Sequence, residues 1–220
     1  MSARDLQPVP RGWQAMCEAQ LPATSIRVET NSAPIRLRND RSIAALTAVR
    51  RMQKPDMFTV GLTEVRIETR IESRSRMMVH GNRISACMRP QFTVYLSLDP
   101  HTVSVASEFS EHSCAFNHIK AHETRHVEVN QRALDEAARE LEFAMREAFG
   151  DQPIHGSPEE LKAWLPAHIR DEWMPWVRAQ MDGTLQLHRQ IDTPQEYARN
   201  QEVCSGAIGK ELNRLRRSRH

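Results

Sequence analysis

Hydrophobic and polar residues alternate along the first half of the chain, which is the pattern of half-buried β-strands. The clearest example is residues 65–72, where Val, Ile and Thr on one face alternate with Arg and Glu on the other. Shorter alternations, separated by turn residues, occur at residues 25–30, 34–38, 83–88, 92–98 and 102–106. Because strands joined by short turns usually pair with the next strand along the chain, the pattern predicts an antiparallel β-meander.

Two local features lie between these strands. A short helix is expected after the strand at 34–38, and Asn39 or Asp40 can cap its N-terminus. Asp99-Pro100 is a turn signal and is expected to separate the last two strands.

Past residue 110 the hydrophobic period lengthens to 3.6 residues, as in amphipathic helices. Residues 114–149 form one long helical pattern, and Gly150 follows where a C-terminal cap is expected. Ser157 and Thr193 each begin a further helix, because each is a capping residue followed by proline and, three residues later, by glutamate.

These patterns predict an α+β fold with an N-terminal antiparallel β-meander, a long helix and a C-terminal helical region. The length of 220 residues suits a single domain, residues 1–220, with a strand-rich half at 25–108 and a helix-rich half at 110–220. The sequence contains no run of 18 apolar residues, so no membrane span is expected.

An HExxH motif, His122-Glu123-Thr124-Arg125-His126, lies inside the long helix. Residues four apart share one face of a helix, so both imidazoles can reach a single ion, and zinc accepts neutral imidazole nitrogens. Glu123 points off that stripe and can take a proton from a water activated by the metal. The motif therefore predicts one Zn²⁺ per chain held by His122 and His126, with Glu123 as the general base of a peptidase.

A catalytic zinc site needs a third protein ligand. The C-terminal region offers these candidates: His155, His168, Asp171, Glu172, His188, Asp192, Glu196 and Glu202. We favour Glu196, because it lies in the first turn of a helix and is held there beside a loop; His188 and Asp192 come next. The alternative role of Glu196 is structural, as the glutamate that completes the cap of Thr193.

Two other residues near the motif receive lesser roles. His118 precedes His122 by four residues, but it lies about 12 Å from His126 along the helix axis, so one ion cannot bind all three. Tyr197 can donate a hydrogen bond to a developing oxyanion, or it can simply pack in the core.

The segment Cys114–Asn130 (CAFNHIKAHETRHVEVN), with the strands before it, resembles a family of bacterial predicted zinc-dependent proteases, most of them exported. The resemblance implies the two motif histidines as ligands, Glu123 as catalytic residue and a zincin-like domain. The longer metzincin signature is absent, because Val129 and Arg132 stand where it requires Gly and His.

The four cysteines, Cys17, Cys87, Cys114 and Cys204, have no CxxC spacing, so they do not predict a thiolate zinc site. Their even number is compatible with two disulfides in an oxidising compartment, and three pairings are open. Cys114–Cys204 is the most plausible bridge, because it would tie the start of the motif helix to the C-terminal segment. The cysteines lead us to expect a periplasmic or secreted protein. Because MSARDLQPVPRGW has no apolar core, its signal peptide would already have been removed. Free thiols in a cytoplasmic protein are the alternative.

The net charge of +2 does not indicate a nucleic-acid partner, and the basic residues Arg214, Arg216, Arg217 and Arg219 are typical of a solvated helix end. The sequence thus predicts a zinc peptidase that acts on a peptide or protein, bound along an edge strand at 102–106. Two alternatives stay open. One is a catalytically inactive zincin-like protein with a structural metal, whose fourth coordination position is filled by protein. The other is a basic-tailed nucleic-acid-binding module.

Overall fold

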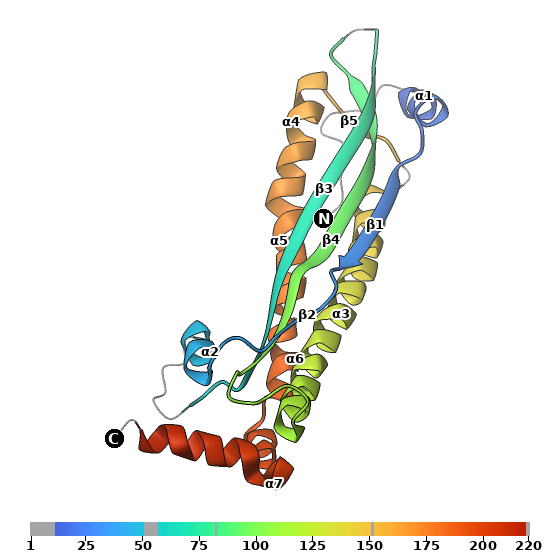
Figure 1. Cartoon of the computed structure of the whole chain (residues 1–220). Coiled ribbons are helices and arrows are strands. Elements are labelled where there is room, and N and C mark those ends of the chain that lie inside the picture. The colour runs from blue at the N-terminus through green and yellow to red at the C-terminus, as the bar shows by residue number, and fades with distance from the viewer. Residues whose placement is uncertain (1–11, 51–56, 82, 151, 219–220) are drawn as a thin grey trace. The chain divides into compact units, whose positions relative to one another are not determined.

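The computed structural model describes residues 12–50, 57–81, 83–150 and 152–218 (Figure 1). Residues 1–11 and Arg219 lie outside these ranges. The expectation about the N-terminal segment falls mostly on the former, and the expectation about the basic tail falls partly on the latter. The chain forms two compact units, and each draws on both the strand-rich and the helix-rich half of the sequence. Unit 1 comprises Met1–Asn31, Glu68–Ser97 and Leu134–Asp182, and unit 2 comprises Ser32–Ile67, Leu98–Ala133 and Gly183–His220.

The described residues form a mixture of helices and strands, as predicted. In chain order the elements are α1 (Trp13–Gln20), β1 (Ser25–Ser32), β2 (Arg36–Arg38), α2 (Ile43–Val49), β3 (Gly61–Val79), β4 (Ala86–Val105), α3 (Cys114–Phe149), β5 (Ile154–Gly156), α4 (Pro158–His168), the π-helical turn η1 (Ile169–Trp173), α5 (Met174–Asp182), α6 (Thr184–Ile191) and α7 (Pro194–Arg217). The long elements β3, β4 and α3 contribute residues to both units.

The central strand of the sheet is β4, which pairs with β1, β2, β3 and β5. β2 runs parallel to β4, with Arg36–Arg38 opposite residues 102–104, while β5 runs antiparallel to it. The predicted antiparallel meander is therefore wrong, because in a meander each strand pairs with the next along the chain. The reason is the length of β4: its 20 residues stay extended through Asp99-Pro100, where a turn was expected, and so offer pairing positions to several shorter strands.

The predicted boundaries of the helices are largely confirmed. α3 spans Cys114–Phe149, and Gly150 follows it with φ of 53°, a left-handed conformation that glycine adopts without strain. Ser157 caps α4 and exchanges hydrogen bonds with Glu160 in both directions. Thr193 caps α7 through its hydroxyl oxygen.

The cap of α2 differs from the prediction. Ser42 is the capping residue, and its hydroxyl accepts the amide of Ala45. Asn39 instead donates to backbone carbonyls at the end of β4 and in the loop that follows it. Asp40 pairs with Arg38. Both expected capping side chains are thus engaged elsewhere by tertiary contacts or near neighbours.

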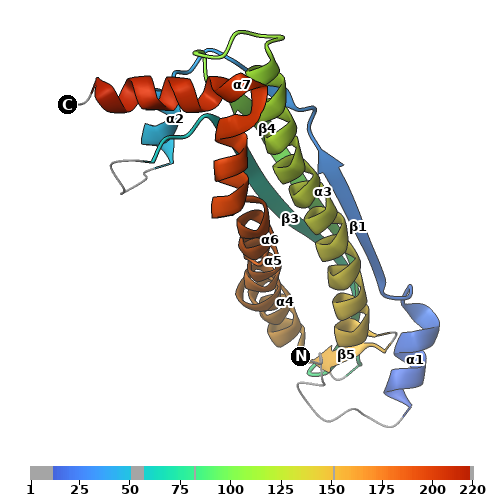
Figure 2. The ribbon, with the colours of Figure 1, turned by 90° about the horizontal axis from the view of Figure 1, so that it is seen from below.

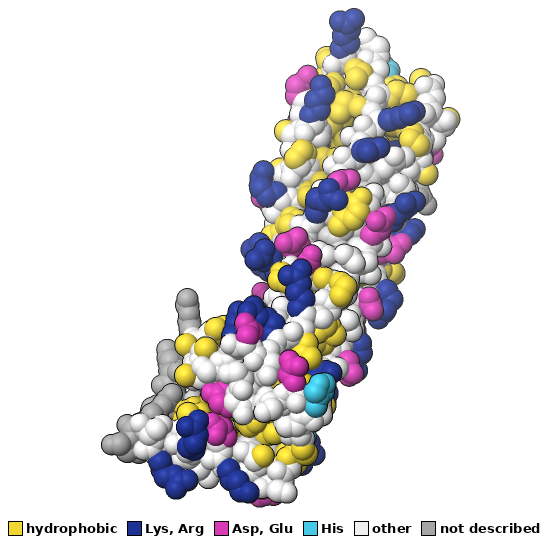
Figure 3. Space-filling model, in the orientation of Figure 1, with side chains coloured by type: hydrophobic (Ala, Val, Ile, Leu, Met, Phe, Trp, Pro, Cys, Tyr) yellow, Lys and Arg dark blue, Asp and Glu magenta, His cyan; other side chains and the backbone are white. Residues whose placement is uncertain are grey.

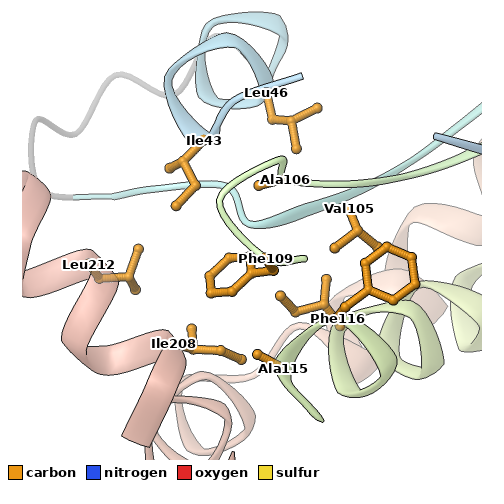
Figure 4. Packing of buried hydrophobic residues seen from close by; sticks show 10 residues of the cluster. Ile43, Leu46, Val105, Ala106, Phe109, Ala115, Phe116, Ile208 and Leu212 are labelled. Atoms are coloured by element: carbon orange, nitrogen blue, oxygen red, sulfur yellow. The ribbon is translucent and has the colours of Figure 1, made fainter. Parts of the chain in front are cut away.

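Unit 2 is built on an apolar core where α2, the end of β4, the start of α3 and the second part of α7 meet (Figure 4). Its buried members are Ile43, Leu46, Val105, Ala106, Phe109, Ala115, Phe116, Ile119, Ile208 and Leu212. Burial of each large apolar side chain contributes about 1.5–3 kcal/mol to the stability of the fold. This core therefore fixes the two helices that carry most of the candidate site.

Unit 1 has a separate core. Ring contacts surround Phe149, which packs against Phe92, Trp164 and Trp173. A smaller cluster joins Trp13 of α1 to the disulfide-bonded Cys17 and Cys87 together with Leu21.

The surface carries mixed charge. On the face shown in Figure 3, basic and acidic side chains are interspersed. In the C-terminal part of α7, Arg214 donates to Glu211 and Arg216 donates to Asn213, so part of the basic tail is paired within its own helix. None of the described helices combines the length and the apolar character that crossing a membrane requires.

All four cysteines are paired, Cys17 with Cys87 in unit 1 and Cys114 with Cys204 in unit 2. The second bridge is the one that the sequence favoured. Cys204 lies in a break of α7 where residues 204–206 adopt left-handed conformations, with φ of 57° at Cys204. Such a conformation is unfavourable for a residue with a side chain, so the bridge holds α7 in a bend that the backbone alone disfavours.

Replacing Cys114 and Cys204 together with alanine is expected to lower the free energy of unfolding by about 2–5 kcal/mol. The bridge joins residues 90 positions apart, and its loss increases the conformational entropy of the unfolded chain, which favours unfolding. Urea unfolding measures the effect. The matched control removes Cys17 and Cys87, 70 positions apart in unit 1, and should destabilise the protein without changing metal affinity. An unchanged unfolding free energy in the first variant would contradict the prediction.

Candidate metal centre

The two motif histidines lie one turn apart on the buried face of α3. His122 and His126 are 8% and 7% exposed, and their ring centroids are 5.2 Å apart. α6 and the start of α7 run beside this part of α3 (Figures 1 and 2). The helix period thus brings both imidazoles to one point, as the spacing predicts, and α6 supplies the residues opposite them.

Asp192, directly after α6, completes a group that could hold a metal ion. Its Oδ1 lies 3.2 Å from Nε2 of His122 and 3.2 Å from Nε2 of His126, and the three ligand atoms all lie within 4.8 Å of one another. Tetrahedral ligands at zinc distances of about 2.0–2.2 Å are separated by roughly 3.3–3.6 Å. The two nitrogen–oxygen distances lie just below that range, so a small opening of the group would fit an ion of that size.

Glu196, the third ligand favoured from the sequence, is not part of this group. Its carboxylate accepts hydrogen bonds from Arg125 and Arg199. Its Oε1 lies 3.4 Å from Nδ1 of His122, the ring nitrogen that faces away from Asp192. The two arginines occupy the oxygens that a metal would need, so we move the third-ligand assignment from Glu196 to Asp192, one of the alternatives named above.

The remaining candidate ligands lie elsewhere. Glu202 is exposed on α7. The metal group belongs to unit 2, whereas unit 1 contains His155, His168, Asp171 and Glu172. His118 lines the same cavity as the metal group, and its Nε2 lies 2.8 Å from Oδ1 of Asn200, so it has a partner of its own.

A chain of polar side chains stands behind His126. Its Nδ1 lies 2.9 Å from Nδ1 of His188, whose Nε2 lies 3.0 Å from Oδ1 of Asn130. Asn130 turns its amide nitrogen to His101, so its oxygen faces His188 and can only accept. His188 then donates from Nε2 and accepts at Nδ1. His126 consequently donates from Nδ1, as in the tautomer whose Nε2 lone pair can bind a metal.

Two pKa shifts bear on the protonation of His188 and Asp192. Burial, with the neighbouring His126, lowers the pKa of His188, which keeps that ring neutral and able to accept. Burial alone would raise the pKa of Asp192, but its contacts with His122 and His126 and its hydrogen bond with Arg50 outweigh it and hold that pKa well below its usual range. Arg50 lies 2.9 Å from the far oxygen, Oδ2. Asp192 is thus a carboxylate, the form that binds metals.

The outward nitrogen of His122 has two neighbours. Nδ1 lies 2.7 Å from Nη2 of Arg125 and 3.4 Å from Oε1 of Glu196. Arginine can only donate, so the contact with Arg125 leaves the proton on Nε2. A metal held by Nε2 requires that proton on Nδ1, and Glu196 is the neighbour that can accept a hydrogen bond from it.

Glu123 lies beside the metal group and is not a member of it. The side chain is 6% exposed, and Oγ1 of Thr63 lies 2.8 Å from its Oε2. Burial raises the pKa of Glu123, although the hydrogen bond from Thr63 opposes the shift. A buried carboxylate with a raised pKa takes up a proton more readily than an exposed one, as a general base must.

Gly61 at the start of β3 leaves the space that Glu123 fills. A Cβ on Gly61 would lie 2.5 Å from Oε1 of Glu123 and 2.6 Å from Cγ2 of Ile119, closer than real contacts allow. Only a residue without a side chain lets β3 approach α3 here.

Gly61→Ala is expected to displace the Glu123 carboxylate. If Glu123 is the general base that the motif predicts, hydrolysis should fall by about 100-fold, the effect of a misplacement near 1 Å. Zinc content should stay at the wild-type value, because the residue touches no ligand. Gly81→Ala is the matched control, since a Cβ there meets nothing within 4 Å. Equal activity of the two variants, with zinc bound in both, would contradict the prediction.

A cavity of about 430 Å³ connects these groups. Its lining includes His122, Glu123, His126 and Asp192, so one molecule in the cavity can reach the metal position and Glu123 together. Tyr197 lines it as well. Burial and the charge of Asp192 raise the pKa of Tyr197, so its hydroxyl stays protonated and can donate a hydrogen bond.

The sequence interpretation did not identify the supporting residues. Asn130 could have been found, because it continues the four-residue stripe of the two histidines along α3. Gly61, Thr63 and Arg50 carry no such signal, since their contacts with α3 and Asp192 arise only when the chain folds.

The chain matches no protein-family model, no curated protein and no solved structure.

Proposed function

We propose that the chain is a zinc-dependent peptidase in which His122, His126 and Asp192 hold the ion and Glu123 is the general base. The observation that carries the proposal is the place of Glu123, buried next to the metal group and outside it, on the lining of the same cavity. Among the described residues the group offers three ligands. Three protein ligands and an open position are the arrangement of catalytic zinc sites, whereas structural sites have four.

The donor set favours zinc, with one competitor. Two imidazoles and a carboxylate bind zinc in hydrolases, and they also bind Fe(II) in oxygenases. The glutamate that directly follows the first histidine favours the hydrolase arrangement, in which it is the general base. All cysteine thiols are in disulfides, so no thiolate competes for the ion.

The chain's own groups can then carry out the proton transfers. A zinc ion supplies Lewis acidity, which polarises a carbonyl and acidifies water. Glu123 takes a proton from the attacking water and passes it to the leaving amine. Thr63 holds one carboxylate oxygen in place, which leaves the other to move the proton. Tyr197 is placed on the cavity lining to donate to the developing oxyanion.

An extended substrate would lie along β3. Among the described strands β3 pairs only with β4, and its first residues, Gly61–Thr63, line the cavity. A peptide that adds to the unpaired edge of a strand gains main-chain hydrogen bonds. The strand at 102–106, which the sequence suggested for this role, is not an edge, because it belongs to β4 and pairs with β2.

We also place the protein in the periplasm or outside the cell. The two disulfides support this proposal, since such bridges persist in oxidising compartments and are rare in the cytoplasm.

Metal removal tests the proposed function. The purified protein is expected to carry about one zinc per chain and to cleave an unstructured protein such as denatured casein. Dialysis against a strong chelator should abolish cleavage, and one equivalent of zinc should restore it. Cleavage by metal-free protein would refute the mechanism. Zinc bound by four protein ligands in X-ray absorption, with no cleavage, would favour a structural metal instead.

A further inference from the structure

The cavity has a second part that the mechanism does not use. Its wall is apolar and comes from the segment before β3, from β3 itself, from α3 and from α7: Phe58, Val60, Leu62, Ile119, Ile208 and Leu212. Ile119, Ile208 and Leu212 are buried members of the unit 2 core, while the other three are partly buried. The wall therefore has a fixed floor and a more accessible rim.

The apolar wall adjoins the side chain of Glu123, the proposed general base. Ile119 and Glu123 both come within 2.6 Å of the point where a Cβ on Gly61 would lie, so their side chains adjoin at that glycine. A group bound against Ile119 would consequently lie next to the group on which Glu123 acts.

The far side of the wall comes from the second part of α7. Figure 4 shows Ile208 and Leu212 projecting from this helix towards Phe109 and Ala115. The bend at residues 203–206 sets the direction of that helix, and the Cys114–Cys204 bridge ties the bend to the start of α3. The wall is thus held in place before any ligand binds.

The carboxylates on the lining do not favour a cationic occupant. Among the described lining residues the carboxylates are Glu123 and Asp192, and both have partners already. A cationic group would therefore lack a free acid. Of the two arginines on the lining, Arg50 pairs with the carboxylate of Asp192, while Arg216 donates to the neutral side chain of Asn213 and lies over the ring of Phe58, 5.9 Å from its centroid.

We infer that this apolar wall receives a large uncharged side chain, aliphatic or aromatic, from the substrate residue next to the scissile bond. The inference rests on the proposed function and names the substrate class of that site. A cavity of about 430 Å³ lies within the size range of small-molecule sites, roughly 300–1,000 Å³, so it has room for such a side chain beside a peptide backbone.

Binding of two metal-directed probes tests the inference without measuring hydrolysis. Acetohydroxamate has no side chain, and 4-methylpentanohydroxamate carries a leucine-like one. Isothermal titration of zinc-loaded protein should show about 10- to 100-fold tighter binding of the second, since each buried methylene contributes to affinity. A succinic monohydroxamate, with a carboxylate on its chain, should gain nothing over acetohydroxamate.

Matched variants on α7 locate the effect. Leu212→Ala enlarges the cavity at the wall. The affinity of the leucine-like probe relative to acetohydroxamate should fall at least about threefold, while the affinity of 3-phenylpropanohydroxamate should rise relative to the leucine-like probe. Leu215→Ala is the control, because Leu215 packs against the same core and does not line the cavity. Val60→Phe at the partly buried rim is a second variant that leaves the core intact. It should reduce the advantage by filling the space.

The outcomes separate the two proposals. Equal affinities of the two first probes, or tighter binding of the acidic probe, would overturn the apolar site and leave the peptidase proposal standing. Equal advantages in the Leu212 and Leu215 variants, with no loss in Val60→Phe, would also overturn it. Failure of every hydroxamate to bind zinc-loaded protein would overturn the open metal position, and both proposals would fall with it.

Discussion

Glu123→Gln is expected to lower turnover of a peptide substrate by about 100- to 10,000-fold, the usual contribution of a general base. The amide has nearly the shape of the carboxylate and can still contact Thr63, but it cannot take up a proton. Because burial disfavours a charge at this position, the neutral side chain should not reduce the melting temperature. Zinc content should stay at one per chain, since Glu123 lies outside the metal group.

The control for this variant is Glu128→Gln, which changes an exposed glutamate of the same helix. It should leave turnover, zinc content and melting temperature at wild-type values. Steady-state kinetics on one fluorogenic peptide, with zinc measured by elemental analysis on the same samples, provides the comparison. Wild-type turnover by Glu123→Gln would remove the general-base role, whatever the metal does.

The helices could be predicted because their signals are local. α3 begins at Cys114 and ends at Phe149, as its hydrophobic period and Gly150 indicate, and Ser157 caps the next helix as its neighbours suggest. Each of these signals depends on residues within one or two turns of the helix. The cap of α2 was misassigned because it depends on a long-range contact: Asn39 donates to carbonyls more than 60 positions away.

The sheet could not be predicted in the same way. The alternation marks which residues are extended, but it carries no information on which strands pair. β2 lies parallel to residues 102–104 of β4, a contact over more than 60 positions, and it could not be inferred from turn length. The strands were therefore largely located and their topology was not.

In the site, too, the local feature could be predicted and the long-range contact could not. The spacing of the HExxH motif within one helix predicted that His122 and His126 would converge. Asp192 and Glu196 are two carboxylates four positions apart at the junction of α6 and α7. The position in the first helical turn that favoured Glu196 carries no information on which of the two faces the histidines. Their roles are decided by Arg125, which faces Glu196, and Arg50, which turns Asp192 towards the histidines.

Removing the Asp192 carboxylate should therefore weaken zinc binding more than removing that of Glu196. Asp192→Ala deletes a proposed ligand, as His122→Ala and His126→Ala do, and each should lose most of its zinc. Glu196→Ala deletes only the acceptor for Nδ1 of His122, and loss of such an outer partner typically lowers metal affinity by about 10- to 100-fold. A competition titration against a chromophoric chelator ranks the four variants.

Glu211→Ala is the matched control for these variants, because Glu211 also pairs with an arginine in α7 but does not line the cavity. Its zinc affinity should equal that of the wild type. The ranking discriminates because Asp192 and Glu196 both neighbour His122 but differ in the nitrogen that they face, Nε2 and Nδ1 respectively. If Glu196→Ala loses more zinc than Asp192→Ala, then Arg125 must give up its hold on Glu196 when the metal binds, and Glu196 would be the third ligand. If the order is the expected one, Glu196 fixes the proton of His122 on the nitrogen away from the metal, and Asp192 binds the ion.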